Sequence, residues 1–239
     1  MWYNISMNGK PLNRKSYGSI PHLPESRLGP SDRSIDVGQS NILTKAVRDK
    51  HDSIIVQTKV DGSNVAIAKV DGQIVALGRA GYMAWSSPHE QHKVFARWVQ
   101  AREADFHKCL NDGEWISGEW LAQAHGTKYD LYDLEPFVAF DLWVDGDRVC
   151  FQEMFDRVCL YVLVVPTLVA GNRSVSIKEA LEFAKENSYG AIDPVEGAVW
   201  RCERKGKVEF LAKFVEHFKQ DGKYFPQNNG GEIIWNWKV

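Results

Sequence analysis

Short stretches of apolar and β-branched residues, separated by turns rich in glycine, proline and aspartate, make up most of this chain. Such stretches are typical of strands in half-buried or fully buried sheets. They predict strands at residues 53–58, 65–70, 73–78, 115–120, 137–144, 148–151, 162–168, 195–201 and 207–214. The pattern indicates an α+β fold in which strands outnumber helices.

Two other segments repeat their apolar positions at the spacing of a helix. One covers residues 88–104, with Ser87 as a candidate N-cap and Pro88 at the first helical position, where a missing N–H costs nothing. The other begins at Ser176, which forms a capping box with Glu179. These helices are expected to flank the sheets.

The tetrapeptide Lys-Val-Asp-Gly occurs twice, at residues 59–62 and 69–72. The second copy joins two strand-like stretches through an Asp-Gly loop, the strongest short-range signal of a type I′ hairpin. Continuing the hairpin register outward places Asn64 opposite Arg79, beside the first copy. The first copy follows a predicted buried strand that closes at Lys59. Taken alone it is as well explained by a solvated turn as by a functional site.

The composition fits one compact unit, because the chain has 239 residues of which 44% are apolar. A net charge of -2 argues against a global positive field for nucleic acid, so any polyanion site must be local. The longest apolar run, residues 160–170, contains a proline and is shorter than the roughly 20 residues that cross a bilayer. The amino terminus lacks the apolar core of a signal peptide. We therefore expect a cytoplasmic protein with no membrane partner.

The first Lys-Val-Asp-Gly copy is one of several short motifs along the chain that resemble those of a known superfamily. Residues 59–64 resemble motif I, K-x-D-G-x-N, of the covalent nucleotidyltransferases, the superfamily of ATP-dependent ligases and mRNA capping enzymes. Motifs III, IIIa, IV and V are matched by S-G-E-W at 117–120, F-D-L-W at 140–143, E-G-A-V at 196–199 and Lys213. One departure is Leu211, where motif V commonly has a first lysine. The segments 17–28 and 118–130 narrow the resemblance to RNA ligases of the branch typified by phage RNA ligase 2.

The resemblance implies a fold and a domain organisation. It implies a nucleotidyltransferase domain, an ATP-grasp-like ligase adenylation unit of antiparallel sheets with flanking helices, over residues 1–225. Residues 226–239 would form a short C-terminal tail that contains Trp235 and Trp237. The stretch 214–239 after motif V is too short for the five-stranded OB-fold that capping enzymes and DNA ligases carry there. No OB-fold domain is therefore expected.

The resemblance also implies an activity. An ATP-dependent RNA ligase joins a 3′-OH end to a 5′-phosphate end through a covalent lysyl-AMP intermediate and an adenylylated 5′ end. The implied cofactors are ATP and Mg²⁺ or Mn²⁺, and the implied partner is RNA that carries these two ends. A large RNA-engaging C-terminal domain has no room in this chain. A partner protein that supplies RNA-binding surface is therefore a further expectation.

The family motifs assign a role to each candidate residue. Lys59 would be the catalytic nucleophile, which requires its pKa to be lowered from about 10.4, and the Glu196 carboxylate would bind the metal. Arg27 would contact RNA or phosphate. The nucleotide-binding residues would be Asp61, Gly62, Asn64, Arg79, Glu119, Phe140 and Lys213.

Three of these roles are specific. Asp61 would contact the ribose or orient the lysine, Glu119 would bind the ribose, and Phe140 would stack on the adenine. Each residue alone also has an ordinary interpretation, as a core aromatic or a solvated strand position. The assignment has one geometric requirement, which is that a single pocket unites Lys59, Glu119, Phe140, Glu196 and Lys213.

Alternatives from other classes remain open. A capping guanylyltransferase or a DNA ligase shares motifs I and IV. An RNA-binding protein that has lost catalysis would fit the Leu211 departure. A small structural domain with accidental motifs is the remaining alternative, and a fold that scatters the motif residues would favour it.

Overall fold

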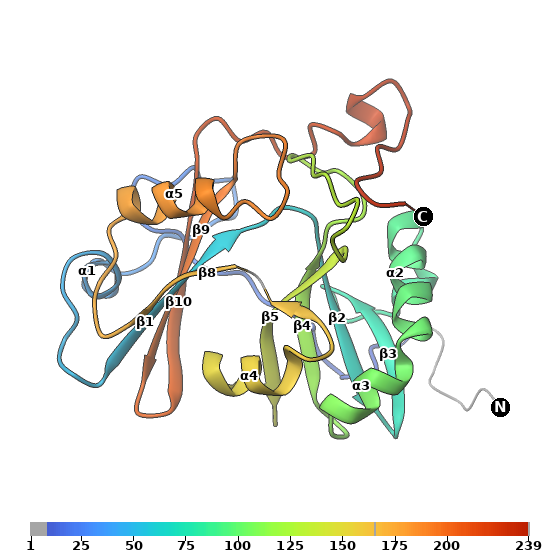
Figure 1. Ribbon diagram of the computed structural model, residues 1–239, viewed down its shortest axis with the longest axis horizontal. Coiled ribbons are helices and arrows are strands. Elements are labelled where there is room, and N and C mark those ends of the chain that lie inside the picture. The colour runs from blue at the N-terminus through green and yellow to red at the C-terminus, as the bar shows by residue number, and fades with distance from the viewer. Residues whose placement is uncertain (1–8, 165, 239) are drawn as a thin grey trace.

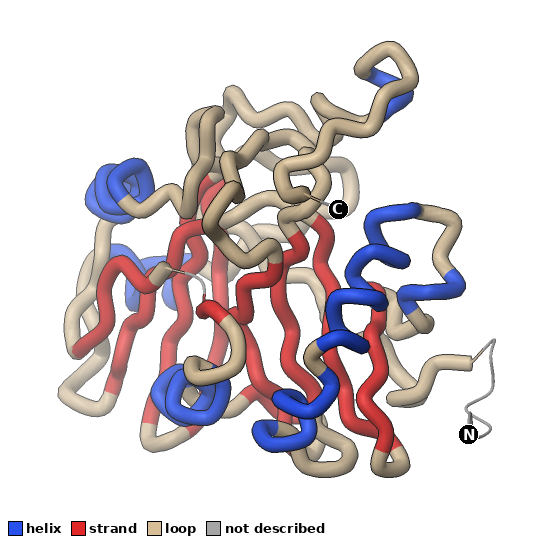
Figure 2. The backbone as a smooth tube through the Cα atoms, turned by 45° about the vertical axis from the view of Figure 1, so that its right-hand side comes forward, coloured by secondary structure: helices blue, strands red, loops and turns tan. Residues whose placement is uncertain are grey.

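The structure is a computed structural model that describes residues 9–164 and 166–238. Two sheets stand side by side, with helices on their outer sides (Figures 1 and 2). Apart from one short parallel pairing, both sheets are antiparallel. The predicted α+β class of antiparallel sheets with flanking helices is confirmed.

The first sheet has the strand order β10-β9-β1-β8. It comprises β1 (Asp52–Lys59), β8 (Thr167–Gly171), β9 (Gly197–Arg204) and β10 (Lys207–Val215). Its outer face packs against α1 (Val37–Thr44) and α5 (Ile177–Glu186) in one apolar cluster. These two helices lie at the left of Figure 1.

The second sheet has the order β3-β2-β4-β5-β6, with β7 pairing β5 in parallel. Its strands are β2 (Ser63–Val70), β3 (Gln73–Gly78), β4 (Trp115–Trp120), β5 (Phe137–Val144), β6 (Asp147–Arg148) and β7 (Leu163–Val164). Its outer face packs against α2 (Glu90–Ala101), α3 (Glu103–Cys109) and α4 (Phe151–Val158). Two 3-10 turns, η1 (Ala84–Ser86) and η2 (Pro226–Asn228), complete the described elements.

Strand alternation sets which side chains face the gap between the sheets. In β1, Ile54 and Val56 belong to the apolar cluster with α1 and α5, so Gln57 and Lys59 point to the opposite, inner face. In β2, Val65 and Ile67 pack toward α2, so Asn64 points inward. Polar residues of both sheets therefore face each other.

The predictions of the hairpin and of the Ser176 N-cap are confirmed. Strands β2 and β3 pair Val70 with Gln73, and Asp71 and Gly72 have φ values of 50° and 73°, as a type I′ turn requires. The Ser176 side chain accepts a hydrogen bond from the Glu179 N–H at 3.2 Å. Both signals are local, which is why the sequence was sufficient to find them.

The helix predicted at 88–104 has different bounds. It is two helices, α2 and α3, separated at Arg102, and α2 begins at Glu90 rather than at Pro88. Ser87 is not its N-cap, because its hydroxyl accepts from the His89 N–H before the helix begins. The prediction of an amphipathic helix here is correct, but its predicted start is two residues too early.

Two strand predictions are wrong or only partly right. The strand at 148–151 is absent beyond Arg148, because α4 begins at Phe151 and packs Met154 and Val158 against the second sheet. The strand at 162–168 is two strands, β7 and β8, which belong to different sheets. Pro166 lies between them and has no N–H for a continuous ladder. Helix α1 has no sequence counterpart among the predictions, since only Ser40 and Leu43 are buried in it.

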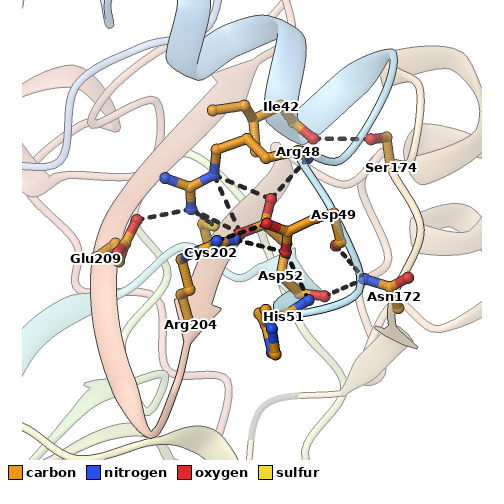
Figure 3. A network of polar contacts seen from close by, with 10 residues as sticks. All are labelled: Ile42, Arg48, Asp49, His51, Asp52, Asn172, Ser174, Cys202, Arg204 and Glu209. Carbon is orange, nitrogen blue, oxygen red and sulfur yellow. Dashed lines mark hydrogen bonds and ion pairs between the residues drawn. The ribbon is translucent and has the colours of Figure 1, made fainter.

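A network of charged side chains closes the amino-terminal end of β1 (Figure 3). The buried Asp52 carboxylate accepts from Arg48 at 2.7 Å and from Arg204 at 2.8 Å. Arg204 also pairs with Asp49, and Arg48 also pairs with Glu209 on β10. The network fixes β1 against β9 and β10 at the end opposite Lys59.

The C-terminal segment packs against its own chain. The Asn236 N–H donates to the Ala122 carbonyl at 2.8 Å, and the Trp237 ring lies 6.1 Å from that of Trp120. Trp235 packs against the apolar cluster of the second sheet. The two tail tryptophans thus cover the loop that follows β4.

Across residues 9–164 and 166–238, none of the helices has the length and apolar character that a membrane span requires.

Candidate active site

A cavity lies between the inner faces of the two sheets. Its lining includes the predicted residues Lys59, Asn64, Arg79, Glu119, Phe140 and Lys213. These side chains come from β1, β2, β4, β5 and β10 and from the residue after β3. Four of the five residues in the geometric requirement therefore line one cavity, whereas the fifth, Glu196, is not part of the lining and lies beside Lys59.

Lys59 ends β1 and points into the cavity. It pairs with Gly197 in the ladder to β9, so Glu196 lies directly beside it and accepts a hydrogen bond from its Nζ at 2.7 Å. Burial, the largest influence, lowers the pKa of Lys59, but the charges of Glu196, Glu119 and Asp61 outweigh burial and raise that pKa to about 12. The lowered pKa expected of a nucleophile is therefore not supplied by these side chains alone.

Gly197 lets the motif IV strand approach its neighbour. A Cβ atom at this position would overlap the carbonyl oxygen of Phe214 on β10. The Glu216 N–H also donates to the Glu196 carbonyl at 2.9 Å. The glycine thus allows β9 to begin close enough to β10 for Glu196 to reach Lys59.

Glu119 and the motif I turn are joined directly. Asn64 and Glu119 are partners in the β2–β4 ladder, and the Gly62 N–H donates to Glu119 Oε1 at 3.1 Å. A Cβ atom on Gly62 would overlap the Trp120 carbonyl oxygen, so glycine is required. Burial, opposed in part by Lys59, raises the pKa of Glu119 to about 7.

Phe140 lies half-buried on the wall formed by the second sheet. The β4–β5 register shifts between Ser117 and Gly118, which leaves Phe140 outside the regular pairing. Tyr17 meets it edge to face, with the ring centroids 5.1 Å apart. The aromatic wall of the cavity therefore has two members.

Lys213 and Arg79 are two of the cationic residues that line the cavity with Lys59. Lys213 sits on β10, and its backbone pairs with the N-terminal segment through Pro21 and Leu23 at 3.0 and 2.8 Å. Burial, together with the charge of Lys59, lowers the pKa of Lys213. Arg79 donates to the Gly18 carbonyl at 3.1 Å. Leu211, at the departure from motif V, also lines the cavity and adds apolar surface.

Asp61 is placed differently from the other motif residues. Its carboxylate accepts from the Gly126 N–H at 2.7 Å and pairs with Lys219, and its own N–H donates to the Tyr129 hydroxyl at 2.8 Å. Like Gly62 and Glu196, it is not part of the cavity lining. Of the two roles expected for Asp61, orientation of the lysine turn fits this position better than contact with a ribose.

Arg27 lies away from the cavity lining. It forms an ion pair with Asp221 at 2.9 Å, and its N–H donates to the Val215 carbonyl at 3.0 Å. The side chain is one-third exposed. The contact of Arg27 with RNA or phosphate therefore stays a prediction, and it requires a ligand long enough to extend from the cavity to this position beside β10.

The donor set fits a divalent cation that is completed by phosphate oxygens. Among the described residues no three His, Cys, Asp or Glu side chains form a ready-made metal cage. Mg²⁺ is commonly held by one or two carboxylates plus substrate phosphates, and Glu196 and Glu119 offer such carboxylates. The raised pKa of Glu119 shows that negative charge is costly here, which a bound cation would relieve.

Several residues of the site escaped sequence reasoning. Tyr17 lies within the segment 17–28 that resembles RNA ligases, but nothing marked it individually. Asp141, which lies within F-D-L-W but was given no role, and Arg201, which follows the motif IV match, line the cavity and pair with each other. Lys219 is buried against Asp61 and stands among other lysines without a distinguishing pattern.

The chain matches the model of the RNA ligase family over residues 52–215. That range holds both Lys59 and Lys213, and thus all the motifs from I to V. A search of curated proteins found no match.

Solved RNA ligases share the fold. An archaeal ATP-dependent RNA ligase superposes with a TM-score of 0.56 and 17% identity, over 84% of this chain and 48% of that one. An apo mutant of a Naegleria gruberi RNA ligase gives 0.53 and 17%, over 85% and 58%. A Naegleria gruberi RNA ligase mutant with AMP and Mn gives 0.52 and 17%, over 74% and 53%. The chain spans about half the length of these structures.

Proposed function

Because the chain belongs to the RNA ligase family, we propose that it is an ATP-dependent RNA ligase that works through a covalent lysyl-AMP intermediate. The observation that carries this proposal is that Lys59, Glu119, Phe140 and Lys213 line one cavity, and that Glu196, which is not part of its lining, accepts a hydrogen bond from Lys59 Nζ at 2.7 Å. Lys59, Glu196 and Lys213 belong to the first sheet or its strand ends, and Glu119 and Phe140 belong to the second, so motif residues of both sheets lie close together.

Lys59 is the proposed nucleophile. Its Nζ, once deprotonated, attacks the α-phosphorus of ATP, the bond from that phosphorus to the bridging oxygen breaks, and pyrophosphate leaves. The Glu196 carboxylate holds Nζ at 2.7 Å and thereby fixes its direction. A divalent cation held by Glu196 would supply positive charge that lowers the pKa of Lys59 and neutralises the phosphate oxygens.

The remaining residues of the cavity bind and orient the nucleotide. Phe140 offers an aromatic face on which the flat adenine ring can stack. Asn64 Oδ1 is buried without a hydrogen-bond partner in the described structure, and is therefore available to a ligand hydroxyl. Lys213 and Arg79 are placed to contact phosphates.

The later steps concern the RNA ends. AMP passes from Lys59 to a 5′-phosphate, and a 3′-hydroxyl then displaces AMP to form the phosphodiester bond. Arg27 and the exposed Arg79 are the proposed contacts for the incoming RNA. A partner protein that adds RNA-binding surface remains part of this proposal.

In the experiment the protein is incubated with α-labelled ATP and Mg²⁺ and divided into two samples. One sample is denatured to detect covalent label, and the other is kept native and receives 5′-phosphorylated nicked RNA. We expect covalent label on the protein, and its transfer to and release from RNA as strands are joined. Lys59→Ala should abolish labelling, while Lys69→Ala, which changes the hairpin copy of the motif, should retain it. Labelling from GTP alone would favour a capping activity, and labelling without any joining would contradict the ligase proposal.

A further inference from the structure

Lys219 is a buried lysine whose charge is used inside the protein. Its side chain is 2% exposed, and its Nζ pairs with the Asp61 carboxylate and donates to Thr127 Oγ1 at 2.7 Å. Lysine is almost never fully buried unless it is paired. The segment after β10 therefore places the Lys219 ammonium group against Asp61 of the motif I turn.

The Lys219 side chain is closely packed against the segment around Gly126. A Cβ atom on Gly126 would stand 2.7 Å from Lys219 Cε and would overlap the Gln220 carbonyl oxygen. The Tyr224 N–H donates to the His125 carbonyl at 2.7 Å, which ties the same two segments together a second time. The close approach of residues 125–127 and 219–224 is thus built around the lysine side chain.

The contacts of Asp61 carry the effect of Lys219 to the reactive turn. Asp61 is also fixed by the Gly126 N–H and by the Tyr129 hydroxyl, at 2.7 and 2.8 Å. Two residues before it is Lys59, and the residue after it, Gly62, donates to Glu119. A shift of Asp61 would therefore move the nucleophile and a proposed ribose ligand together.

We propose that Lys219 is a positioning residue for lysine adenylylation, which holds Asp61 so that the turn from Lys59 to Gly62 presents Nζ to the α-phosphate. This inference rests on the proposed function. Lys219 acts through Asp61 and touches neither ATP nor the reacting atoms. It supplies, from outside the cavity lining, a cation that the five motifs do not include.

The test measures single-turnover formation of lysyl-AMP in the full chain at a series of ATP concentrations. Lys219→Met should slow the rate at saturating ATP by about 10²-fold, the scale on which a misplacement of about 1 Å acts. The ATP concentration that gives half the maximal rate should change little. A purely structural role would instead lower the fraction of protein that becomes labelled, without changing the rate of the folded part.

Lys223→Met is the matched control. Lys223 lies in the same segment and pairs with Asp193 at 3.1 Å, but its side chain is 43% exposed. An exposed ion pair of this kind contributes little to the stability of the fold. The Lys223→Met variant should therefore form lysyl-AMP at the wild-type rate. If Lys219→Met does not fold, Lys219→Gln, which keeps a donor of similar length, should give an intermediate rate.

The second arm combines Lys219→Met with Asp61→Asn. If Lys219 acts through Asp61, the double variant should be no slower than Asp61→Asn alone, and multiplied effects would contradict the proposal. An unchanged rate in Lys219→Met would overturn it while leaving the ligase proposal intact. Absence of label from wild type would instead overturn the proposed function.

Discussion

Glu119 is a buried residue whose negative charge is unfavourable in the cavity. Its carboxyl is held among Asp61 and Glu196, away from water, and burial raises its pKa to about 7. The Gly62 N–H and the charge of Lys59 offset only part of this cost. A charged group kept where it is unfavourable indicates selection for binding rather than for stability.

Replacing Glu119 by glutamine should therefore stabilise the protein without ligand. A carboxyl whose folded pKa exceeds its unfolded value binds more protons in the folded state, so its stability contribution falls as pH rises from about 4.5 to about 7. At pH 8 the free energy of unfolding of Glu119→Gln should exceed that of wild type by about 1–3 kcal/mol. Most of this difference should vanish at pH 5. Urea unfolding at the two pH values checks it, and a less stable variant at pH 8 would contradict the account.

At the scale of the elements, the two ends of β1 have different surroundings. Its carboxyl end presents Lys59 to the cavity, and its amino end is fixed by the network around Asp52 (Figure 3). Burial opposes charge on Asp52, but the hydrogen bonds from Arg48 and Arg204 prevail and lower its pKa to about 2. One strand thus separates a stabilising end from a reactive end.

Asp52→Asn should lower stability and leave chemistry intact. Removing one partner of a buried charge network costs about 3–5 kcal/mol, because Arg48 and Arg204 lose their shared carboxylate. The rate of lysyl-AMP formation by the folded fraction should equal that of wild type, since the change lies at the far end of the strand. Urea unfolding and single-turnover labelling on the same preparation provide both readouts. A large fall in the labelling rate would contradict the division proposed for β1.

The start of β9 offers a second test at this scale. Gly197→Ala forces a Cβ against the Phe214 carbonyl, so β9 and β10 must separate where Glu196 approaches Lys59. We expect a loss of about 2–4 kcal/mol in stability, together with loss of adenylylation. Gly206→Ala is the control. Gly206 has a φ of 75° and open space around it, so its change should cost only about 1–2 kcal/mol and spare activity. Equal effects of the two changes would refute the steric argument.

The elements also show what the sequence could and could not predict. The β2–β3 hairpin was predictable to the residue, because Asp71 and Gly72 specify their turn locally. The motif residues could be named as a set because the sequence resembles motifs I to V of the nucleotidyltransferases, not because the strand pattern marks them. Helix α4 was not predictable, since its burial depends on packing under the second sheet rather than on its own short pattern. Lys219 was not, because only the fold reveals that one lysine among several is buried against Asp61.

At the scale of the whole molecule, the cavity exists because two sheets are held at a fixed separation. Arg201 on β9 donates to the Phe140 carbonyl at 3.0 Å and to the Val149 carbonyl at 3.2 Å, and it pairs with Asp141. These contacts join the first sheet to β5 of the second. A nucleotide in the cavity would add a further bridge, since Lys59 and Phe140 belong to different sheets.

ATP with Mg²⁺ should therefore raise the thermal unfolding temperature of the whole domain in one transition. At 100 times the dissociation constant the expected gain is about 2.7 kcal/mol. Lys59→Ala, which cannot turn ATP over, should retain most of this gain, whereas Phe140→Ala should lose much of it. Differential scanning calorimetry provides the measurement. Stabilisation by GTP but not by ATP would contradict the assignment of adenine to the aromatic wall.

We propose that Lys59 is the residue that carries AMP. The most direct measurement is to incubate the protein with ATP and Mg²⁺ and to digest it under conditions that preserve the phosphoramidate bond between lysine and AMP. Mass spectrometry then locates the adenylylated residue. The account predicts AMP on Lys59 and on no other lysine, with Lys69 and Lys213 unmodified. AMP on either of those residues, or a fully active protein that never carries AMP, would contradict it.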